Sequence, residues 1–302
     1  MLCCCFIPSS SSARELDDVW RTYLTSPPPH AISLASDLKA RADSLASEIQ
    51  SSSLAVDLSD IDVVVSGGGN YDAFYLGVQM MMSRLEGPRI NVARYAGVSA
   101  GGMMPFEVAL KGEDATLLSH LSYGVLTEEY SEHYKSTLQA GYLEDHHWRI
   151  MAAWQTETYA DRLAGLDGRV IMGTSCFKPL PTLVLIDSYT AVDDQATHAF
   201  MSTGTYLEMY GGYPCTDGGL TTGDKMTPLF QDNVRPQMVV DLMATGANSE
   251  LVFKVLLDDY VDLIKTGMDE FVNFVTKGQT EREGIISLCP VGSDVKDFVC
   301  KV

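Results

Sequence analysis

The most constraining feature of this sequence is a pair of glycine-containing loops, each placed directly after a short run of strand-forming residues. Residues 61–65 are rich in β-branched side chains and are followed at once by Gly67-Gly68-Gly69. Residues 90–96 form the next such run and lead into Gly97-Val98-Ser99-Ala100-Gly101. Short apolar runs of this kind are typical of parallel strands that are buried on both faces of a sheet.

A helical pattern follows each loop. Phe74, Val78, Met81 and Leu85 repeat at helical spacing before Gly87-Pro88, and residues 100–110 form a second expected helix, which Pro105 should kink or shorten. The order strand, glycine loop, helix, strand, serine turn, helix describes a βαβ unit. Both loops then lie at the carboxyl edge of a parallel sheet, where ligands bind in open α/β folds. We therefore expect an α/β protein with a central, mainly parallel sheet.

The rest of the chain fits around this unit. We expect helices over most of residues 113–165, a hairpin of strands at 170–172 and 180–186, a strand at 237–243, a long helix from Ser249 to Gly278, and an edge strand at 285–288. Before the unit, residues 1–14 are expected to be disordered, and helices are expected at 15–24 and 31–49. We divide the chain into an accessory N-terminal region, residues 1–55, and a main domain, residues 56–302.

The charge of the chain excludes one class of partner. Its 40 acidic and 21 basic residues give a formal net charge of −19. Such a surface repels phosphate backbones, so we expect no nucleic-acid binding. It also repels anionic lipid head groups, so electrostatic attraction to an anionic bilayer is not expected.

Seven cysteines are too few and too scattered for a disulfide scaffold, and Cys176, Cys215, Cys289 and Cys300 are expected to be free thiols in a reducing, cytoplasmic compartment. No ligand spacing for a metal is found, and no metal or cofactor is expected. No signal peptide or membrane-spanning segment is predicted. Two interpretations of Cys3-Cys4-Cys5 remain open: S-acylation, which would hold the chain at the periphery of a membrane, or a tail that happens to be rich in cysteine.

Ser99 is the candidate nucleophile. A serine on a sharp turn between a strand and a helix has an exposed hydroxyl, and small neighbours are needed there because bulky ones would collide with the flanking elements. A base must accept the serine proton. The six histidines all lie at or before His198, so a triad with histidine would have to use Asp187 and His198. The other candidate base is Asp217, in the turn Asp217-Gly218-Gly219, where an aspartate alone is most often a turn residue.

The glycine triplet is the candidate donor site for an oxyanion. Glycines let the backbone approach a ligand closely, and the N–H groups of Gly67, Gly68 and Gly69 would then point at the oxygen that becomes negative when an ester carbonyl is attacked. The other interpretation is a tight turn without a ligand. A dinucleotide site is excluded because Asp72 stands where GxGxxG needs its third glycine, and a P-loop is excluded because no Gly-Lys-Ser/Thr follows.

Taken in order, Gly67-Gly68-Gly69, the motif around Ser99 and Asp217-Gly218-Gly219 resemble the three motifs of the patatin-like phospholipases over about residues 56–224. The resemblance implies a three-layer α/β/α fold with a mainly parallel sheet and hydrolysis of a lipid or acyl-ester substrate through a serine–aspartate dyad. It assigns Ser99 as nucleophile, Asp217 as base, and Gly67, Gly68 and Gly69 as the oxyanion hole. It implies no metal or organic cofactor.

Two positions depart from the family pattern. Tyr71 replaces a basic residue, and Asp72 replaces a glycine, where a carboxylate would oppose an oxyanion unless it turns away. These departures motivate an alternative, a catalytically impaired patatin-like protein that binds lipid or acts as a scaffold. A soluble esterase for small acyl esters is a further alternative, which differs mainly in the size of its pocket.

Overall fold

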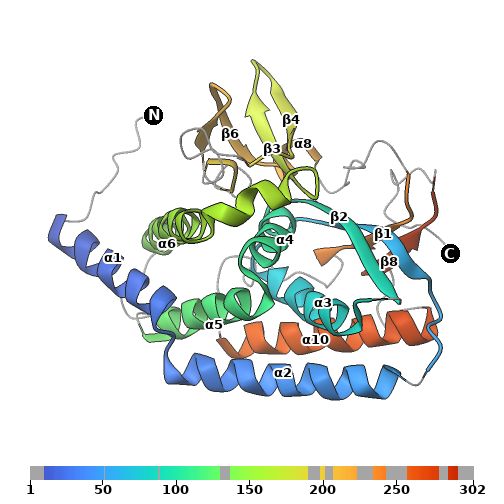
Figure 1. Cartoon of the computed structure of the whole chain (residues 1–302). Helices are drawn as coiled ribbons and strands as arrows, with labels where there is room; N and C mark the ends of the chain where they lie inside the picture. The colour runs from blue at the N-terminus through green and yellow to red at the C-terminus, as the bar shows by residue number, and fades with distance from the viewer. Residues whose placement is uncertain are drawn as a thin grey trace.

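The computed structural model describes residues 10–50, 52–87, 89–129, 137–189, 198–200, 207–222, 234–242, 257–278 and 285–291. Over these residues the chain is an α/β protein, in which helices flank a mixed sheet with parallel central strands (Figure 1). The fold class predicted from the sequence, a three-layer α/β/α arrangement with a mainly parallel central sheet, agrees with this structure.

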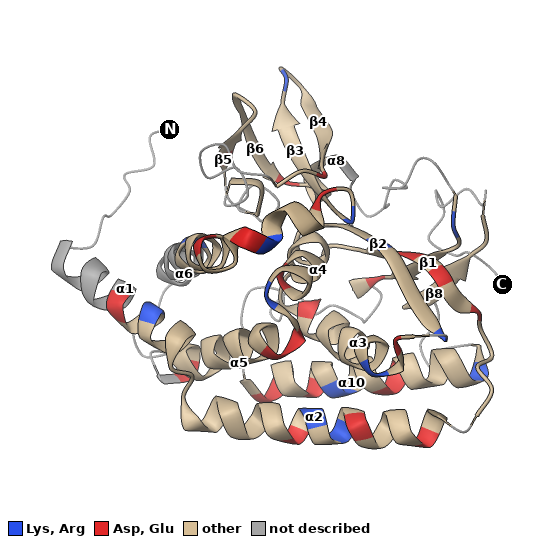
Figure 2. Cartoon of the chain, in the orientation of Figure 1, with Lys and Arg blue, Asp and Glu red and all other residues tan. Residues whose placement is uncertain are grey.

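The sheet has eight strands, and the helices that surround it come from both halves of the chain. The strands are β1 (Leu58–Val65), β2 (Ile90–Val98), β3 (Val170–Phe177), β4 (Pro181–Ile186), β5 (Glu208–Tyr210), β6 (Tyr213–Asp217), β7 (Gln237–Val240) and β8 (Ile286–Cys289). The helices are α1 (Ser10–Thr25), α2 (Pro29–Gln50), η1 (Gly69–Tyr71), α3 (Asp72–Leu85), α4 (Ala100–Lys111), α5 (Glu113–Glu129), α6 (Thr137–Thr158), η3 (Ala160–Leu166), α8 (Gly219–Thr222) and α10 (Leu257–Lys277). Figure 2 shows that charged residues are spread over the helices, whereas the hairpins β3–β4 and β5–β6 are almost uncharged.

The strand order is β5-β6-β3-β2-β1-β7-β8, and β4 pairs with the remaining edge of β3. The pairs β1–β2, β1–β7 and β2–β3 are parallel, so the predicted βαβ unit is confirmed. The predicted hairpin is also confirmed, because β3 and β4 pair antiparallel from Met172–Ile186 to Phe177–Pro181. The expected C-terminal edge strand is present as β8, at the end of the strand order, and it pairs antiparallel with β7.

Strand β3 is the element that brings distant segments together. Since β4 occupies one of its edges over residues 172–177, both β2 and β6 pair with the other edge. Strand β2 covers residues 170–173 of that edge and β6 covers 174–176. The two strands run in opposite directions, so their carboxyl ends meet at Gly173–Thr174.

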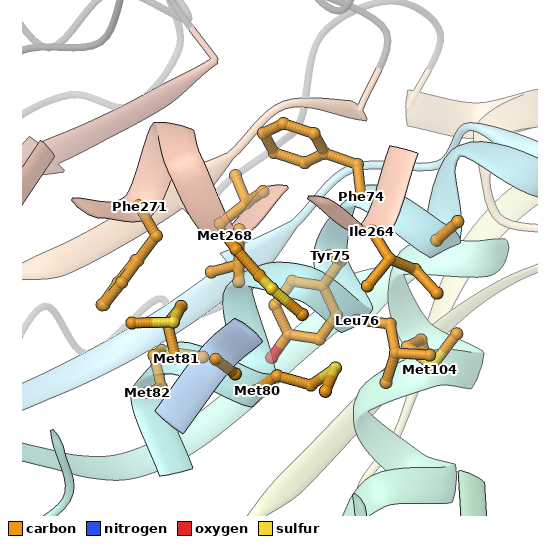
Figure 3. Packing of buried hydrophobic residues seen from close by; sticks show 14 of the residues in the cluster. Phe74, Tyr75, Leu76, Met80, Met81, Met82, Met104, Ile264, Met268 and Phe271 are labelled. Carbon is orange, nitrogen blue, oxygen red and sulfur yellow. The ribbon is translucent and has the colours of Figure 1, made fainter. Parts of the chain in front are cut away.

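The largest hydrophobic core lies between the sheet and the helices α2, α3, α5 and α10. Helices α3 and α10 approach so closely that glycines are needed on both: a Cβ on Gly77 would lie 2.0 Å from the carbonyl oxygen of Ile264, and a Cβ on Gly267 would lie 2.0 Å from that of Phe74. Methionines 80, 81, 82 and 268 fill the space around this crossing (Figure 3). Unbranched methionine side chains adapt well to such irregular gaps.

The N-terminal helices pack on the main domain. Helix α2 was expected over residues 31–49 and is found over Pro29–Gln50, with an alanine-rich face in the same core as β1. The expectation of disorder over residues 1–14 is wrong for Ser10–Arg14, which belong to α1; residues 1–9 lie outside the described residues. Trp20 of α1 stacks on Tyr123 of α5 at 5.8 Å between ring centroids, and this packing supports a longer helix than its sequence alone would.

Of the two expected effects of Pro105, a kink or a shorter helix, the second is not found, since α4 runs from Ala100 to Lys111 with the proline inside it. Proline cannot donate to the carbonyl four residues earlier, which is that of Gly101. The oxygen of that carbonyl lies against the backbone of Gly97, where a Cβ would be only 2.1 Å away. The missing helix bond therefore falls at the place where α4 presses on β2.

Some predicted features lie outside the described residues: the helix cap at Ser249, the first turns of the predicted helix before Leu257, and residue 243 of the predicted strand. Helix α10 ends as expected at Gly278, whose φ is +72° and whose N–H donates to the Phe274 carbonyl. In the part of the chain that the structure describes, no helix has the length and apolar character needed to cross a bilayer.

We expect Gly267→Ala to destabilise the protein by about 1–3 kcal/mol, because the added methyl group meets a backbone carbonyl that only a shift of α3 against α10 can relieve. Urea unfolding measures the change. Gly165→Ala in η3 is the matched control, since nothing lies within 4 Å of its added Cβ. Equal effects of the two substitutions would show that the α3–α10 crossing does not require glycine.

Candidate active site

Ser99 occupies a sharp turn between β2 and α4. Its φ of 54° and ψ of −138° make it the one non-glycine residue with positive φ among the described residues. This backbone conformation is unfavourable for a residue with a side chain, and strained residues of this kind are found mainly at functional sites. The flanking glycines have steric reasons: a Cβ on Gly97 would lie 2.1 Å from the Gly101 oxygen, and a Cβ on Gly101 would lie 2.1 Å from the Ser66 oxygen.

The turn places Ser99 at the amino terminus of α4, where it is the N-cap residue. The Ser99 carbonyl accepts hydrogen bonds from the N–H groups of Gly102 and Met103, at 2.9 and 3.0 Å. The preceding N–H groups, those of Ala100 and Gly101, have no acceptor within the helix, as in any first helical turn. Together with the helix dipole they give the surroundings of Ser99 a partial positive charge.

The glycine triplet lies beside the same serine. A Cβ on Gly67 would lie 3.0 Å from the Ser99 Cβ and 3.6 Å from its Oγ, so the loop and the nucleophile are in direct contact. Gly69 has a φ of +56°, which lets the chain turn from β1 into α3. Among the described residues, no acceptor is found for the N–H groups of Gly67, Gly68 or Gly69. Gly67 is the member of the triplet that lies against Ser99, and an unpaired N–H donor beside a serine hydroxyl is suited to a developing negative oxygen.

Ser66 holds the triplet in place. Its hydroxyl donates to Asp241 Oδ1 at 3.1 Å and accepts from the Leu242 N–H at 2.7 Å. This ties the carboxyl end of β1 to the segment after β7. A Cβ on Gly68 would lie 2.7 Å from that of Leu242, so the loop also packs tightly against this segment. The donor groups are therefore fixed in position before any ligand binds.

Asp217 meets Ser99 across more than a hundred residues of sequence. It ends β6, whose carboxyl end faces that of β2 on the shared edge of β3. The Ser99 side chain acts on the Asp217 carboxylate as a hydrogen-bonding neighbour that lowers its pKa, and Asp217 Oδ1 accepts the Gly219 N–H at 2.7 Å. Burial raises the pKa of Asp217, and these two hydrogen bonds offset part of that rise. The raised pKa makes this carboxylate a stronger base than an exposed aspartate, and the Ser99 side chain is its neighbour.

The glycine after Asp217 is required by the sheet. A Cβ on Gly218 would lie 2.3 Å from the Gly173 oxygen and 2.9 Å from Val98 Cγ1. This is the point where β2, β3 and β6 converge, so a side chain at residue 218 would push Asp217 away from Ser99. The Asp-Gly-Gly pattern therefore follows from close packing as well as from turn geometry.

The expectation of free thiols is wrong for the cysteines that the structure describes. Cys176 of β3 and Cys215 of β6 form a disulfide, and Cys289 also takes part in one; Cys300 and Cys3-Cys4-Cys5 lie outside the described residues. The pairing was missed because the two cysteines are 39 residues apart, and the register that places them opposite each other is not visible in the sequence. The bond clamps β6 to β3 two residues before Asp217.

The alternative triad is not assembled. His198 Nδ1 lies 3.0 Å from Glu208 Oε2, and Glu208 also pairs with Arg149. Asp187 is exposed after the end of β4. His146 and His147 lie within α6, and nothing is described of their side chains. No group of three His, Cys, Asp or Glu side chains in the described ranges is arranged to hold a metal ion.

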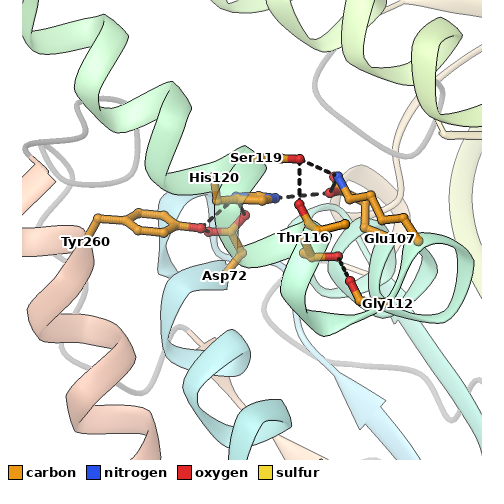
Figure 4. A network of polar contacts seen from close by, with 9 residues as sticks. Asp72, Glu107, Gly112, Thr116, Ser119, His120 and Tyr260 are labelled. Carbon is orange, nitrogen blue, oxygen red and sulfur yellow. Dashed lines mark hydrogen bonds and ion pairs between the residues drawn. The ribbon is translucent and has the colours of Figure 1, made fainter. Parts of the chain in front are cut away.

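Asp72 and Tyr71, which depart from the expected motif, both turn into the core. Asp72 accepts a hydrogen bond from Tyr260 at 3.2 Å and lies 3.8 Å from His120 (Figure 4). Its carboxylate therefore points away from the loop and does not oppose an oxyanion there. Tyr71 is 3% exposed at the start of α3.

A buried polar network continues from Asp72. His120 Nδ1 lies 2.7 Å from the Tyr260 hydroxyl and its Nε2 lies 3.2 Å from Glu107, which pairs with Lys111 at 2.6 Å. Burial raises the pKa of Asp72 to about 6. Burial also acts to raise the pKa of Glu107, but Lys111 and His120 outweigh it and lower that pKa to about 2. Sequence periodicity gave no sign of this network, since its members come from α3, α4, α5 and α10.

Comparison with known protein families finds none that matches this chain, and comparison with curated proteins finds no significant relative. The case for a function therefore depends on the geometry of Ser99, Asp217 and the glycine triplet.

We expect the double variant Cys176→Ser/Cys215→Ser to lose up to about 4 kcal/mol of stability, the chain-entropy value for a separation of 39 residues. Because β6 is then held only by its short ladder, Ser99 should also react more slowly with a fluorophosphonate probe. Unfolding in urea and the rate of labelling below the unfolding transition measure the two effects. A folded variant labelled at the wild-type rate would show that the disulfide does not position Asp217.

The raised pKa of Asp72 predicts a pH-dependent effect of Asp72→Asn. The folded state holds this proton more tightly than the unfolded chain, so the contribution of Asp72 to stability falls as pH rises from about 4 through 6. The variant should therefore gain on the wild type by on the order of 3 kcal/mol between pH 4 and pH 7. Urea unfolding at both pH values measures this gain. Asp37→Asn, on the exposed side of α2, is the control and should show no such trend.

Proposed function

We propose that this protein is a serine acyl hydrolase that cleaves carboxylic esters of lipids through a dyad of Ser99 and Asp217. The observation that carries the proposal is the meeting of the two side chains where the carboxyl ends of β2 and β6 converge on β3, at a strained turn beside the glycine loop. Strain, a base in contact with the nucleophile and unpaired donors next to it are the three parts that acyl transfer requires.

In the first half of the proposed reaction, the Ser99 oxygen attacks the ester carbonyl carbon while Asp217 takes the serine proton. The carbonyl oxygen becomes an oxyanion and accepts hydrogen bonds from the N–H groups of Gly67, Gly68 and Gly69. One such donor typically contributes about 10²–10³ in rate. The intermediate collapses when the bond to the alcohol oxygen breaks, and the proton on Asp217 passes to the departing alcohol.

In the second half, water attacks the acyl group on Ser99. Asp217 accepts a proton from that water, the oxyanion forms again at the glycine loop, and the Ser99 oxygen leaves as the proton returns to it. The fatty acid is released and the dyad is restored. A base with a raised pKa fits this cycle, because it takes up and returns one proton in each half-reaction.

The order of the three motifs supports a patatin-like enzyme. A hydrolase with a histidine triad is less well supported, because His198 is hydrogen-bonded to Glu208. The alternative of an impaired, lipid-binding protein rests on Tyr71 and Asp72. It is weakened by the burial of Tyr71 and by the hydrogen bond that Asp72 accepts from Tyr260 in the core. The cytoplasmic location was expected because the cysteines were expected to be free thiols. The Cys176–Cys215 disulfide removes that support, since disulfides persist mainly in oxidising compartments.

Ser99→Ala should abolish both fluorophosphonate labelling and ester hydrolysis, and Asp217→Asn should lower kcat by about 10⁴ or more because the serine loses its base. Turnover of a phospholipid and of p-nitrophenyl esters of increasing chain length measures these effects. The chain-length series also separates a lipid hydrolase from an esterase for small substrates.

His198→Gln is the matched control, because it changes a histidine bonded to Glu208 and should leave turnover unchanged. Circular dichroism establishes that all three variants are folded. Undiminished hydrolysis by Ser99→Ala, or a collapse of activity in His198→Gln, would refute the dyad. Absence of turnover over a broad ester panel, with lipid still bound, would favour the non-catalytic alternative.

A further inference from the structure

Four strands extend the sheet beyond the helices. They are β5, β6, the carboxyl half of β3 and β4, and with the following helix α8 they project at the top of Figure 1. We call residues 174–186 and 207–222 the hairpin layer. Strand β6 and α8 of this layer flank Asp217, so the layer is continuous with the proposed active site.

The two faces of the hairpin layer differ. Side chains alternate along a strand, and Cys176 and Cys215 point to one face, where they form the disulfide. Their neighbours Phe177 and Pro214 therefore point to the opposite face. Met209 pairs with Pro214, and Pro181 pairs with Phe177, so a row of four apolar residues crosses this outer face.

Large apolar side chains are exposed on the strands and tips of the hairpin layer. Met209 belongs to the row, whereas Tyr213 alternates with Pro214 and lies on the disulfide face. Of eight such side chains in the described residues, five belong to the hairpin layer: Leu180 (73% exposed), Leu207 (65%), Met209 (56%), Leu220 (56%) and Tyr213 (42%). Single exposed apolar residues are ordinary, but a gathering on one projecting element marks an interaction surface.

The hairpin layer is also nearly free of charge, although the chain carries −19. Over residues 174–186 and 207–222, the acidic residues are Glu208 and the proposed base Asp217, and Lys178 is the one basic residue. Glu208 pairs with Arg149 and His198. Lys178 lies over the ring of Tyr213, at 4.8 Å from its centroid. Figure 2 shows the contrast with the acidic helices.

We propose that the hairpin layer docks on a zwitterionic lipid surface. This proposal rests on the proposed function, because a bilayer seated there would hold an acyl ester beside Ser99 and Asp217. The tips suit insertion among acyl chains: Leu180 sits between Pro179 and Pro181, and proline has no N–H to leave unpaired in lipid.

The same prolines argue against a second copy of this chain as the occupant through strand pairing. Edge strand β4 begins with Pro181, and proline at an edge removes a donor that an added strand would need. The lipid should be zwitterionic, because the charge of −19 repels an anionic surface. Binding by apolar insertion should also change little with salt, unlike binding between charges.

The test uses the Ser99→Ala protein, so that vesicles are not consumed, and measures co-sedimentation with phosphatidylcholine vesicles. We expect binding that is insensitive to 0.1–1 M NaCl and weaker when a third of the lipid is phosphatidylserine. Adding Leu180→Asp or Met209→Asp should lower the partition coefficient at least tenfold. Ile32→Asp is the matched control, since Ile32 is 49% exposed on α2, far in the fold from the hairpins, and should leave partitioning unchanged.

No binding to phosphatidylcholine, or equal loss in all three aspartate variants, would overturn the proposal. A dimer in size-exclusion chromatography that Leu180→Asp separates would assign the layer to a second copy instead. Circular dichroism and thermal unfolding establish that each variant is folded. Turnover of a soluble short-chain ester by the wild type keeps the two proposals apart: turnover without vesicle binding refutes docking alone, and vesicle binding without turnover refutes the hydrolase alone.

Discussion

The structure depends on the contact of backbone with backbone at the carboxyl edge of the sheet. The Gly101 carbonyl lies on Gly97, the Ser66 carbonyl lies on Gly101, and the Gly173 carbonyl lies on Gly218. Each contact is closer than any side chain would allow. Together they bring β1, β2, β3 and β6 within reach of one another, and they leave Ser99 in a conformation that a serine adopts only when its surroundings enforce it.

The local parts of this arrangement could be predicted from sequence. Glycines at residues 67–69, 97 and 101 mark places where a chain turns sharply or is approached closely, and apolar periodicity places them between strands and helices. Helix α4 and strand β4 were predicted to within one residue of their observed ends, whereas β3 continues five residues past its predicted end at Met172. The order of the motifs also singled out Asp217, although sequence alone gave no physical reason for it to meet Ser99.

Features that depend on tertiary register could not be predicted. Asp217 reaches Ser99 because β6 fills the half of the β3 edge that β2 leaves open, and no local pattern encodes that division. The Cys176–Cys215 disulfide follows from the same register. The buried position of Asp72 depends on Tyr260 and His120, which are distant in sequence. Pro105 does not shorten α4, because its helix bond is lost at a place where close packing holds the helix on the strand.

The buried network around Asp72 shows how a polar residue next to a reactive site can be kept out of it. A carboxylate in the core is costly unless it is hydrogen-bonded, and Tyr260 and His120 supply those contacts. Glu107 is balanced by Lys111 in the same way. The Asp72 carboxylate consequently does not point at the glycine loop. The same contacts join α3 to α5 and α10 through polar as well as apolar groups.

The pairing of β2 and β6 with successive halves of one edge of β3 has a consequence for how the site forms during synthesis. The serine turn is built from neighbouring segments and can form early, whereas its carboxylate arrives on a strand from far along the chain, and such distant pairings form late. A nascent chain would thus hold Ser99 without its base until synthesis has passed β6. If the protein cleaves lipids, it is harmless to the membranes around it for as long as it is incomplete.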